Sequence, residues 1–398
     1  MVPELMAAYH IQAYALGTLS AFFYYPYVLM QLPVGILVDR YGSRCLLAFT
    51  AFACAGGCYL FAGANSLPLA QLGRFIMGFS ASFAFVGTLK LASVWFPPRR
   101  FGLMASSTQA LGMLGAAVGE APMSLAVAAI GWQHTLFAVA SIFLILGIFI
   151  FLVVRNKPSD ENRYKMSPPC THLSRQKNKP NHLLAGFVRV LKNPQSWLNG
   201  LYAGLVFAPT TAIAEFWGVS FIKTAYHISN HKAAAAISLV FIGWAMGGPL
   251  TGWLSDRLGK RRPIMIASAL LGAITMFSVI FFTHMPVALL FALLFIYGLT
   301  NTGVGIAYAV ASEINPHSIA GTSLAFSNMA SVLLGAALMP VIGFFIERHW
   351  DNVWDNNTPI YSVSDYQHAL WLIPLCSFLG LFIAFMVKET HCKPMKTE

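Results

Sequence analysis

Eleven apolar stretches, each long enough to cross a lipid bilayer, occupy most of this 398-residue chain. A helix needs about 20 apolar residues to span the hydrocarbon core, and these runs are continuous rather than alternating, which is typical of helices and not of barrel strands. Because 57% of the residues are hydrophobic and only 10% are charged, the chain has too little polar surface to cover a water-soluble globule. The sequence therefore predicts an all-α, polytopic membrane protein. The predicted crossings are roughly 14–38, 44–63, 69–95, 103–130, 133–154, 197–221, 233–255, 263–283, 286–311, 319–346 and 367–387.

The basic residues are distributed unevenly among the connections. The net charge of +11 lies in short polar connections between apolar stretches, so it predicts no nucleic-acid partner. Lys and Arg instead accumulate on the cytoplasmic side of membrane proteins, and 20 of the 25 lie in alternate connections and in the C-terminal tail. We therefore predict that this side and the C-terminus are cytoplasmic, in the inner membrane of a bacterium.

The chain contains an internal repeat. The stretch GILVDRYGSR at 35–44 recurs as GWLSDRLGKR at 252–261, and GLMASSTQALGMLGAA from Gly102 is similar to GTSLAFSNMASVLLGAA from Gly321. Two such pairs at half-chain spacing indicate a duplicated helical unit. We expect one bundle at 1–154, a basic cytoplasmic linker at 155–195, a second bundle at 196–388 and a cytoplasmic tail at 389–398.

The repeat also predicts a crossing that the sequence does not show. The second half places a crossing at 197–221 before the one that leads into its repeated loop, and the matching segment of the first half would fall mostly before Met1. We expect either a start codon assigned too far downstream or a real truncation. An intact parent would have twelve crossings with both termini inside.

The repeated loop has a recognisable form. The pattern G-x-L-x-D-R-x-G-x-R between two helices, present in both halves, resembles the signature loop of the major facilitator superfamily (MFS) of transporters. The stretch GRFIMG at 73–78 resembles the RxxxG motif of the same family. The resemblance extends over nearly the whole chain. It implies two pseudo-symmetric bundles that expose a central site to each side of the membrane in turn.

Two further segments bear on the branch of this family. The stretch GMLGAAVGEAP at 112–122 is similar to the glycine motif of antiporters but lacks the Gly-Pro pair in order. The stretch WFPPRR at 95–100 is similar to branches that carry organic anions, amino acids or small peptides. The second resemblance favours a solute that bears a carboxylate.

The repeated loop is predicted to be a gate. Gly35 and Gly252 are expected where two helices approach closely, and Gly42 and Gly259 are expected where a tight turn needs a left-handed backbone. In the family, the loop aspartate caps a helix N-terminus of the other bundle and latches the cytoplasmic side; the alternative is that the Asp-Arg pairs only set topology and turn shape. The predicted gate comprises Gly35, Asp39, Arg40, Gly42, Arg44, Gly252, Asp256, Arg257, Gly259 and Arg261.

Ionisable residues are rare inside the predicted crossings. A charge there costs about 2.5–3.5 kcal/mol on insertion scales, so it usually faces a cavity. Glu120 and Glu215 are the only acidic residues within the apolar windows, and we expect them to load and release protons, the alternative being hydrogen-bonded structural glutamates. Lys90 either binds a substrate carboxylate or snorkels to the interface. Arg74 is expected to anchor the outer surface or to assist proton transfer.

Uncharged polar residues also interrupt the crossings. Each of them alone is more often a helix–helix contact than a ligand contact, but as a set they outline an amphipathic cavity. Gln109 and Asn328 occupy equivalent positions of the repeat. The candidates for substrate binding are Lys90, Gln109, Trp217, Tyr297, Asn301, Asn328, Tyr24 and Tyr27.

The sequence favours a secondary transporter. No GxxxxGK[ST] loop occurs in the chain, so direct use of ATP is not expected, and energy would come from an ion gradient, most simply of protons. None of the 11 histidines pairs with an intramembrane acid, so we expect no enzyme activity, no metal and no cofactor. We predict a monomeric symporter whose partners are the lipid bilayer, a small-molecule substrate and protons. The alternatives are a non-transporting sensor or scaffold and a drug or metabolite efflux antiporter.

Overall fold

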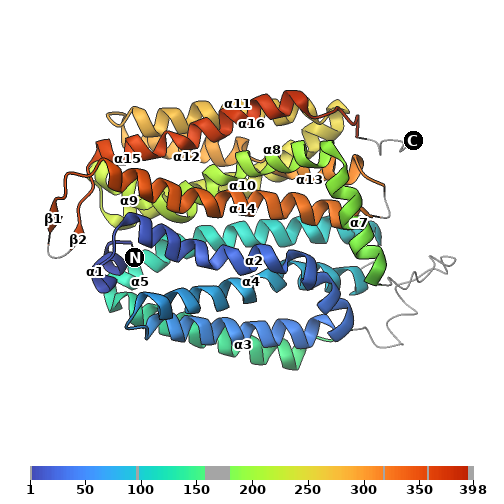
Figure 1. Ribbon diagram of the computed structural model, residues 1–398, viewed down its shortest axis with the longest axis horizontal. Helices are drawn as coiled ribbons and strands as arrows, with labels where there is room; N and C mark the ends of the chain where they lie inside the picture. The colour runs from blue at the N-terminus through green and yellow to red at the C-terminus, as the bar shows by residue number, and fades with distance from the viewer. Residues whose placement is uncertain (1, 96–97, 157–179, 317–318, 356–357, 393–398) are drawn as a thin grey trace.

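The computed structural model describes residues 2–95, 98–156, 180–316, 319–355 and 358–392; the side chains of Asp39 and Gln109 lie outside the described part. Long helices lie side by side across the molecule, and one short hairpin projects at one end (Figure 1). The elements are α1 Val2–Tyr9, α2 Ala13–Tyr41, α3 Ser43–Ala62, α4 Leu67–Trp95, α5 Pro98–Val153, α7 Pro180–Lys192, α8 Pro194–Ala212, η1 Ile213–Trp217, α9 Gly218–Tyr226, α10 Asn230–Leu258, α11 Arg262–Phe281, α12 Val287–Thr300, α13 Gly303–Glu313, α14 Ala320–Arg348, β1 Trp354–Asp355, β2 Thr358–Pro359, α15 Val363–Leu370 and α16 Leu372–Met386.

The predicted crossings all coincide with helical segments. Among the described residues, nine segments are long and apolar enough to cross a membrane. The predicted crossing at 14–38 lies within α2, and the one at 103–130 lies within the first part of α5. The prediction of a helical, polytopic membrane protein is therefore confirmed.

The predicted crossings at 103–130 and 133–154 are the two parts of α5, and the helix is interrupted between them at Gly131, where φ is 80°. Two other crossings are not continuous α-helices, which the apolar windows did not predict. The crossing at 197–221 contains a π-helical turn, η1, between α8 and α9. The crossing at 286–311 is interrupted at Asn301 and Thr302, between α12 and α13. Apolarity decides which segment lies in the bilayer but not where its backbone bends.

Two helix pairs join the halves of the molecule. The first pair is α2 with α14, and the second is α10 with α5. Under the sequence repeat, α2 corresponds to α10 and α14 to α5, so the two pairs are equivalent. Glycines let α2 and α14 approach closely, since a Cβ at Gly17 would lie 2.8 Å from the Met339 carbonyl oxygen and one at Gly343 would lie 2.5 Å from that of Ala13. The halves are therefore two pseudo-symmetric bundles.

Both repeated loops lie at the same end of the molecule. Because Ala13 is beside Gly343 and Gln31 is hydrogen-bonded to Asn328, α2 and α14 run antiparallel. The loop that follows α2 therefore lies near the start of α14, as does the end of α13. We call this the basic end; it comprises the loops after α2 and α10, helix α7 and residues 387–392. Figure 1 shows α7 and the end of α16 at its right. The opposite end is the far end.

Each repeated loop is hydrogen-bonded to a residue that lies three positions after the last helix of its own bundle. The side-chain oxygen of Asn156 accepts the backbone N–H of Arg44 at 2.8 Å. Glu389 Oε1 accepts the backbone N–H of Arg261, also at 2.8 Å. Arg44 and Arg261 occupy equivalent positions of the repeat, so the duplication seen in the sequence recurs in these contacts.

The second repeated loop carries an ion-pair network in which Arg261 and Glu313 are largely buried and Asp256 is exposed. Arg261 binds Asp256 at 2.7 Å and Glu313 at 2.8 Å, and Thr390 of the C-terminal segment donates a hydrogen bond to Glu313. Burial acts to lower the pKa of Arg261, but its hydrogen bonds to Glu313 and Asp256 outweigh this effect and raise it. In the described residues Arg257 forms no such pair; its guanidinium lies 5.2 Å from the centre of the Trp253 ring.

Replacing Arg261 with glutamine should lower the free energy of unfolding by about 3 kcal/mol, because it leaves the carboxylate of Glu313 buried without its cation. Thermal unfolding in detergent measures the change. Arg257→Gln is the matched control, since it removes the neighbouring, exposed charge and should cost about 0.5 kcal/mol or less. Equal melting temperatures for the two variants would show that the network contributes no stability.

The glycines of the predicted gate divide into two groups. Gly42 and Gly259 have φ angles of 80° and 61°, so the expectation of a turn that favours glycine is confirmed. The close helix approach expected at Gly35 and Gly252 is not seen, because no described atom lies within 4 Å of the place that a Cβ would occupy. These faces of α2 and α10 are not in tight contact in this conformation. The latch role of Asp39 concerns a side chain outside the described part and stays a prediction.

Candidate functional site

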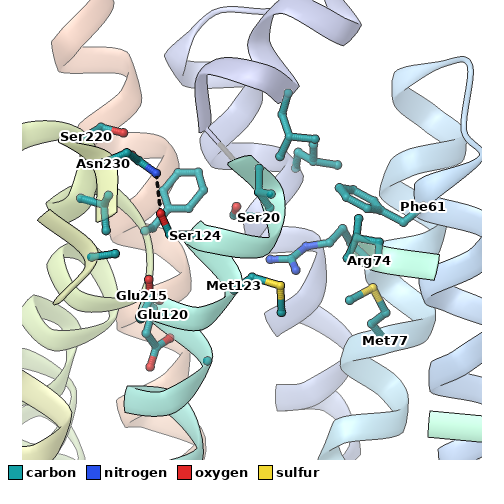
Figure 2. Close-up of a pocket in the computed structure, with 18 residues that line it drawn as sticks. Ser20, Phe61, Arg74, Met77, Glu120, Met123, Ser124, Glu215, Ser220 and Asn230 are labelled. Carbon is teal, nitrogen blue, oxygen red and sulfur yellow. Dashed lines mark hydrogen bonds between the residues drawn. The ribbon is translucent and has the colours of Figure 1, made fainter. Parts of the chain in front are cut away.

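A cavity of about 250 Å³ lies between the two bundles. One wall comes from α1 to α5, and the other comes from η1, α9 and α10. Arg74 and Glu120 line it from the first bundle, and Glu215 and Asn230 line it from the second (Figure 2). The amide of Asn230 donates to Ser124 Oγ at 2.9 Å and joins the bundles at the rim. Because α10 starts at the far end, the cavity lies nearer that end.

Arg74 places a cation on the α4 wall. Its guanidinium carbon lies 5.3 Å from the centre of the Phe23 ring and 6.0 Å from that of Phe61. Such cation–π contacts offset part of the cost of removing the charge from water. No carboxylate in the described part of the chain forms a salt bridge with Arg74. In Figure 2 the guanidinium points into the space between α4 and α5, near Met123, so the cavity contains a cation that can receive an anion.

Glu215 lies on the π-helical turn η1. A π-turn inserts an extra residue into a helix, and such turns occur often at functional sites. The hydroxyl of Tyr24, on α2, donates a hydrogen bond to the Glu215 carboxylate. This bond connects the two bundles, so any movement that separates α2 from η1 must break it.

Glu120 lies on α5, on the same side of the cavity as Glu215 (Figure 2). Its side chain is half-buried. Among the described residues its carboxyl has no hydrogen-bond or ion-pair partner, and the nearby negative charge is that of Glu215. The two acids singled out by the sequence are thus brought together, and they face Arg74 across the cavity.

Three predicted substrate-binding residues, Trp217, Tyr297 and Asn301, are not in the lining of the cavity. Trp217 is fully buried, and its indole N–H donates to the Met339 carbonyl oxygen at 3.3 Å. The amide of Asn301 donates to Thr210 Oγ1 at 2.9 Å and to the Tyr297 hydroxyl at 3.0 Å. Polar groups inside a bilayer bind one another across helices, and these bonds close α12 onto α8 at the helix break. None of the three lines this cavity, so a direct role of these residues in substrate binding stays a prediction.

Two other candidates, Asn328 and Tyr27, belong to a polar cluster between α2 and α14. The amide of Asn328 donates to Gln31 Oε1 at 3.0 Å, and the hydroxyl of Tyr308 donates to Asn328 at 2.9 Å. Tyr27 interacts with Gln31 and Asn328. This cluster joins the bundles on the basic-end side of the cavity, so its contacts are between helices.

The remaining candidates and the unexpected lining residues complete the site. Lys90 is half-buried on α4 and does not line the cavity, and the side chain of Gln109 lies outside the described part. Sequence reasoning missed Ser124, Ser220 and Asn230, which line the cavity. Serines are common in crossings, and Asn230 precedes the apolar window at 233–255, so no sequence signal marked them.

Comparisons with known proteins agree on one family. The model of the Major Facilitator Superfamily matches residues 1–340 and 216–395. The chain is 22% identical over 354 residues to the "Probable galactarate/D-glucarate transporter GudP" of Escherichia coli (strain K12), covering 83% of this chain and 78% of that protein. It is 25% identical over 399 residues to the "Membrane sensor protein UhpC" of the same strain, covering 94% and 86%. Among solved structures it is similar to an inward-facing, unoccupied bacterial homologue of the human lysosomal transporter Spinster, with a TM-score of 0.72, 12% identity and coverage of 97% and 91%.

Proposed function

The chain belongs to the Major Facilitator Superfamily, and on this premise we propose that it imports a small carboxylate-bearing solute together with protons by alternating access. The solute is an organic anion, an amino acid or a dipeptide. The membrane is a bacterial inner membrane, with the basic end and the C-terminus in the cytoplasm, because 20 of the 25 Lys and Arg residues lie on that side. The observation that carries the proposal is Arg74 in the cavity, opposite two carboxyls.

The chemistry of the cavity supports the substrate class. A guanidinium binds a carboxylate through two parallel hydrogen bonds, which gives both attraction and orientation. Arg74 points into the cavity, and no described carboxylate neutralises it. Glu120 on the opposite side can accept hydrogen bonds from the hydroxyl or ammonium groups of such a solute. The relative GudP is named as a probable galactarate/D-glucarate transporter, and these two solutes also carry carboxylates.

The acidic pair supports proton coupling. Glu215 is tied to the other bundle through Tyr24, whereas Glu120 is unpaired among the described residues. Protonation of Glu215 would change its bond with Tyr24, and that bond spans the interface that must open. Protonation of Glu215 and separation of the two bundles therefore both alter the hydrogen bond between Tyr24 and Glu215.

Contacts at the far end support a closed gate there. The amides of Tyr14 and Ala13, at the start of α2, donate to Glu347 Oε1 at 2.6 Å and to the Tyr361 hydroxyl at 3.0 Å. The first amides of a helix have no partner within the helix, and a carboxylate is favourable at this positive end. Residues of the second bundle thus cap a helix of the first. These bonds break when the bundles, placed at 1–154 and 196–388, rock to open the far end.

Replacing Glu347 with glutamine is expected to favour opening at the far end, because the capping charge contributes about 1 kcal/mol, or roughly fivefold in the equilibrium. A cysteine placed at Ser20 in the cavity should then react about five times faster with a membrane-impermeant maleimide. Asp351→Asn is the control, since it removes an exposed acid at the same end. An unchanged labelling rate in Glu347→Gln would remove this contact from the gate.

The proposed function is tested by uptake into proteoliposomes. The probes are radiolabelled D-glucarate, glutamate and alanyl-alanine, each offered with and without an inward proton gradient. We expect at least one of them to accumulate, with a gradient-dependent rate that a protonophore abolishes. Transport of a neutral or cationic solute in place of all three acids would overturn the substrate class.

A sensor is the second candidate, because the chain is similar over 94% of its length to a protein named as a membrane sensor. A sensor would bind its solute without moving it. Binding of a probe that raises the melting temperature, with no uptake in the same preparation, would favour this alternative.

A further inference from the structure

A second pocket lies on the outside of the second bundle, away from the cavity between the bundles. It is an open groove of about 570 Å³ at the basic end of α11. Lys260, Arg262 and His391 border its polar side, and Ile266, Ala267 and Leu270 of α11 form its apolar side. Figure 1 shows α11 and α16 together along one edge of the molecule.

The depth of the groove matches the surface of a bilayer. Arg262 is the first residue of an apolar span that runs to Phe281. Leu270, two turns further along α11, is 41% exposed, as expected of a side chain that faces lipid. The groove therefore has a cationic rim at the level of lipid headgroups and an apolar wall at the level of acyl chains.

The charges in the groove favour an anion. Lys260 is exposed, and its ammonium group has no hydrogen-bond or ion-pair partner in the described part of the chain; only its backbone is bonded, to Ser255. Arg262 is positioned by a hydrogen bond to the Phe385 carbonyl oxygen, and its guanidinium lies 5.8 Å from the Phe385 ring centre. Neither the carbonyl nor the ring neutralises the positive charge of Arg262, and the other N–H groups of its guanidinium can bind a ligand in the groove.

One carboxylate, Glu389, also lines the groove. It accepts the backbone N–H groups of Arg261, Arg262 and His391 at 2.8, 2.9 and 3.1 Å. Partial burial acts to raise the pKa of Glu389, but these three donors outweigh it and hold the pKa below its ordinary value. Glu389 is therefore ionised, and its oxygens already accept backbone N–H groups. The groove also contains two permanent cations, Lys260 and Arg262, so its positive charges outnumber the one negative charge.

We propose that this groove binds an anionic phospholipid of the cytoplasmic leaflet. Lys260 and Arg262 contact the phosphate, His391 contacts the glycerol or phosphate oxygens, and one acyl chain lies along Ile266 and Leu270. Basic pockets at the cytoplasmic surface of membrane proteins recognise headgroups in this manner, with about 1 kcal/mol for each cation. The bound lipid would brace the segment in which Glu389 holds the second repeated loop.

The test is lipid binding by the purified full-length chain in detergent. The probes are phosphatidylglycerol and phosphatidylcholine with identical acyl chains, and inorganic phosphate, each followed by native mass spectrometry and by thermal unfolding. We expect phosphatidylglycerol to bind at least about fivefold more tightly than phosphatidylcholine, and to raise the melting temperature more. We expect Lys260→Gln with His391→Gln to lose at least about fivefold of that affinity.

The matched control is Lys223→Gln with Lys232→Gln, which removes two exposed cations from the far end. It should leave binding of phosphatidylglycerol unchanged. An unaltered melting temperature in phosphatidylcholine shows that both double variants are folded. Equal affinity for the two lipids, an equal loss in the control, or the same stabilisation by inorganic phosphate would each overturn the proposal. Lipid binding and thermal unfolding are measured without transport, so a negative result here would leave the proposed function untouched.

Discussion

Replacing Arg74 with glutamine is expected to reduce uptake of the carboxylate solute at low concentration by roughly 100-fold, because truncating one side of a desolvated charge pair costs about 3 kcal/mol. Arg74→Lys keeps the charge but loses the two-pronged geometry, so we expect a loss of about tenfold, mainly in KM. Initial rates of D-glucarate uptake over a range of concentrations measure both effects. The guanidinium has cation–π neighbours but no described carboxylate, so glutamine should leave no other carboxylate unpaired there.

Lys90→Gln is the discriminating control for Arg74. From the sequence, Lys90 was expected either to bind the substrate carboxylate or to snorkel to the interface, and the structure places it outside the cavity lining. We expect Lys90→Gln to retain uptake within about twofold of the unmodified protein. A larger loss for Lys90→Gln than for Arg74→Gln, at equal melting temperatures, would exchange the two assignments.

The arrangement of helices was predictable because it depends on properties averaged over many residues. An apolar run of about 20 residues lies in the bilayer whichever side chains it contains. The duplication follows from the two loops at 35–44 and 252–261, and the structure repeats it in the contacts of Asn156 with Arg44 and of Glu389 with Arg261. The boundary at Gly131 was also predicted, since it falls between the expected crossings at 103–130 and 133–154. The interruption at Asn301 was not predictable, because it depends on the local backbone.

The site was predicted only in part, because facing a cavity depends on how neighbouring helices are rotated. Glu120 and Glu215 were identified because an acid in a bilayer is costly wherever it points. Arg74 was expected either to anchor the outer surface or to assist proton transfer, and the structure places it in the lining of the cavity, which extends toward the far end. Tyr297 and Asn301 were assigned to the cavity from their polarity, yet they bind each other and Thr210. Polarity alone does not separate a helix contact from a ligand contact.

Replacing Glu215 with glutamine is expected to abolish accumulation driven by a proton gradient while solute exchange continues. For one proton per solute, a gradient of one pH unit drives about tenfold accumulation, and this ratio should fall to about one. Glutamine cannot exchange a proton but can still accept a hydrogen bond from Tyr24, so binding and rocking persist. Counterflow of D-glucarate between equal pools measures exchange, and net uptake under a gradient measures coupling.

Glu120→Gln separates the roles of the two acids. If Glu120 carries the proton and Glu215 only holds the bundles together, Glu120→Gln loses accumulation, and Tyr24→Phe impairs exchange. If Glu215 carries it, Tyr24→Phe keeps accumulation but moves the pH dependence, because the carboxylate loses the hydroxyl that donates to it. Asp351→Asn, at an exposed acid of the far end, should change neither rate. Unchanged accumulation in both Glu120→Gln and Glu215→Gln would show that the protons do not pass through this pair, whatever the solute.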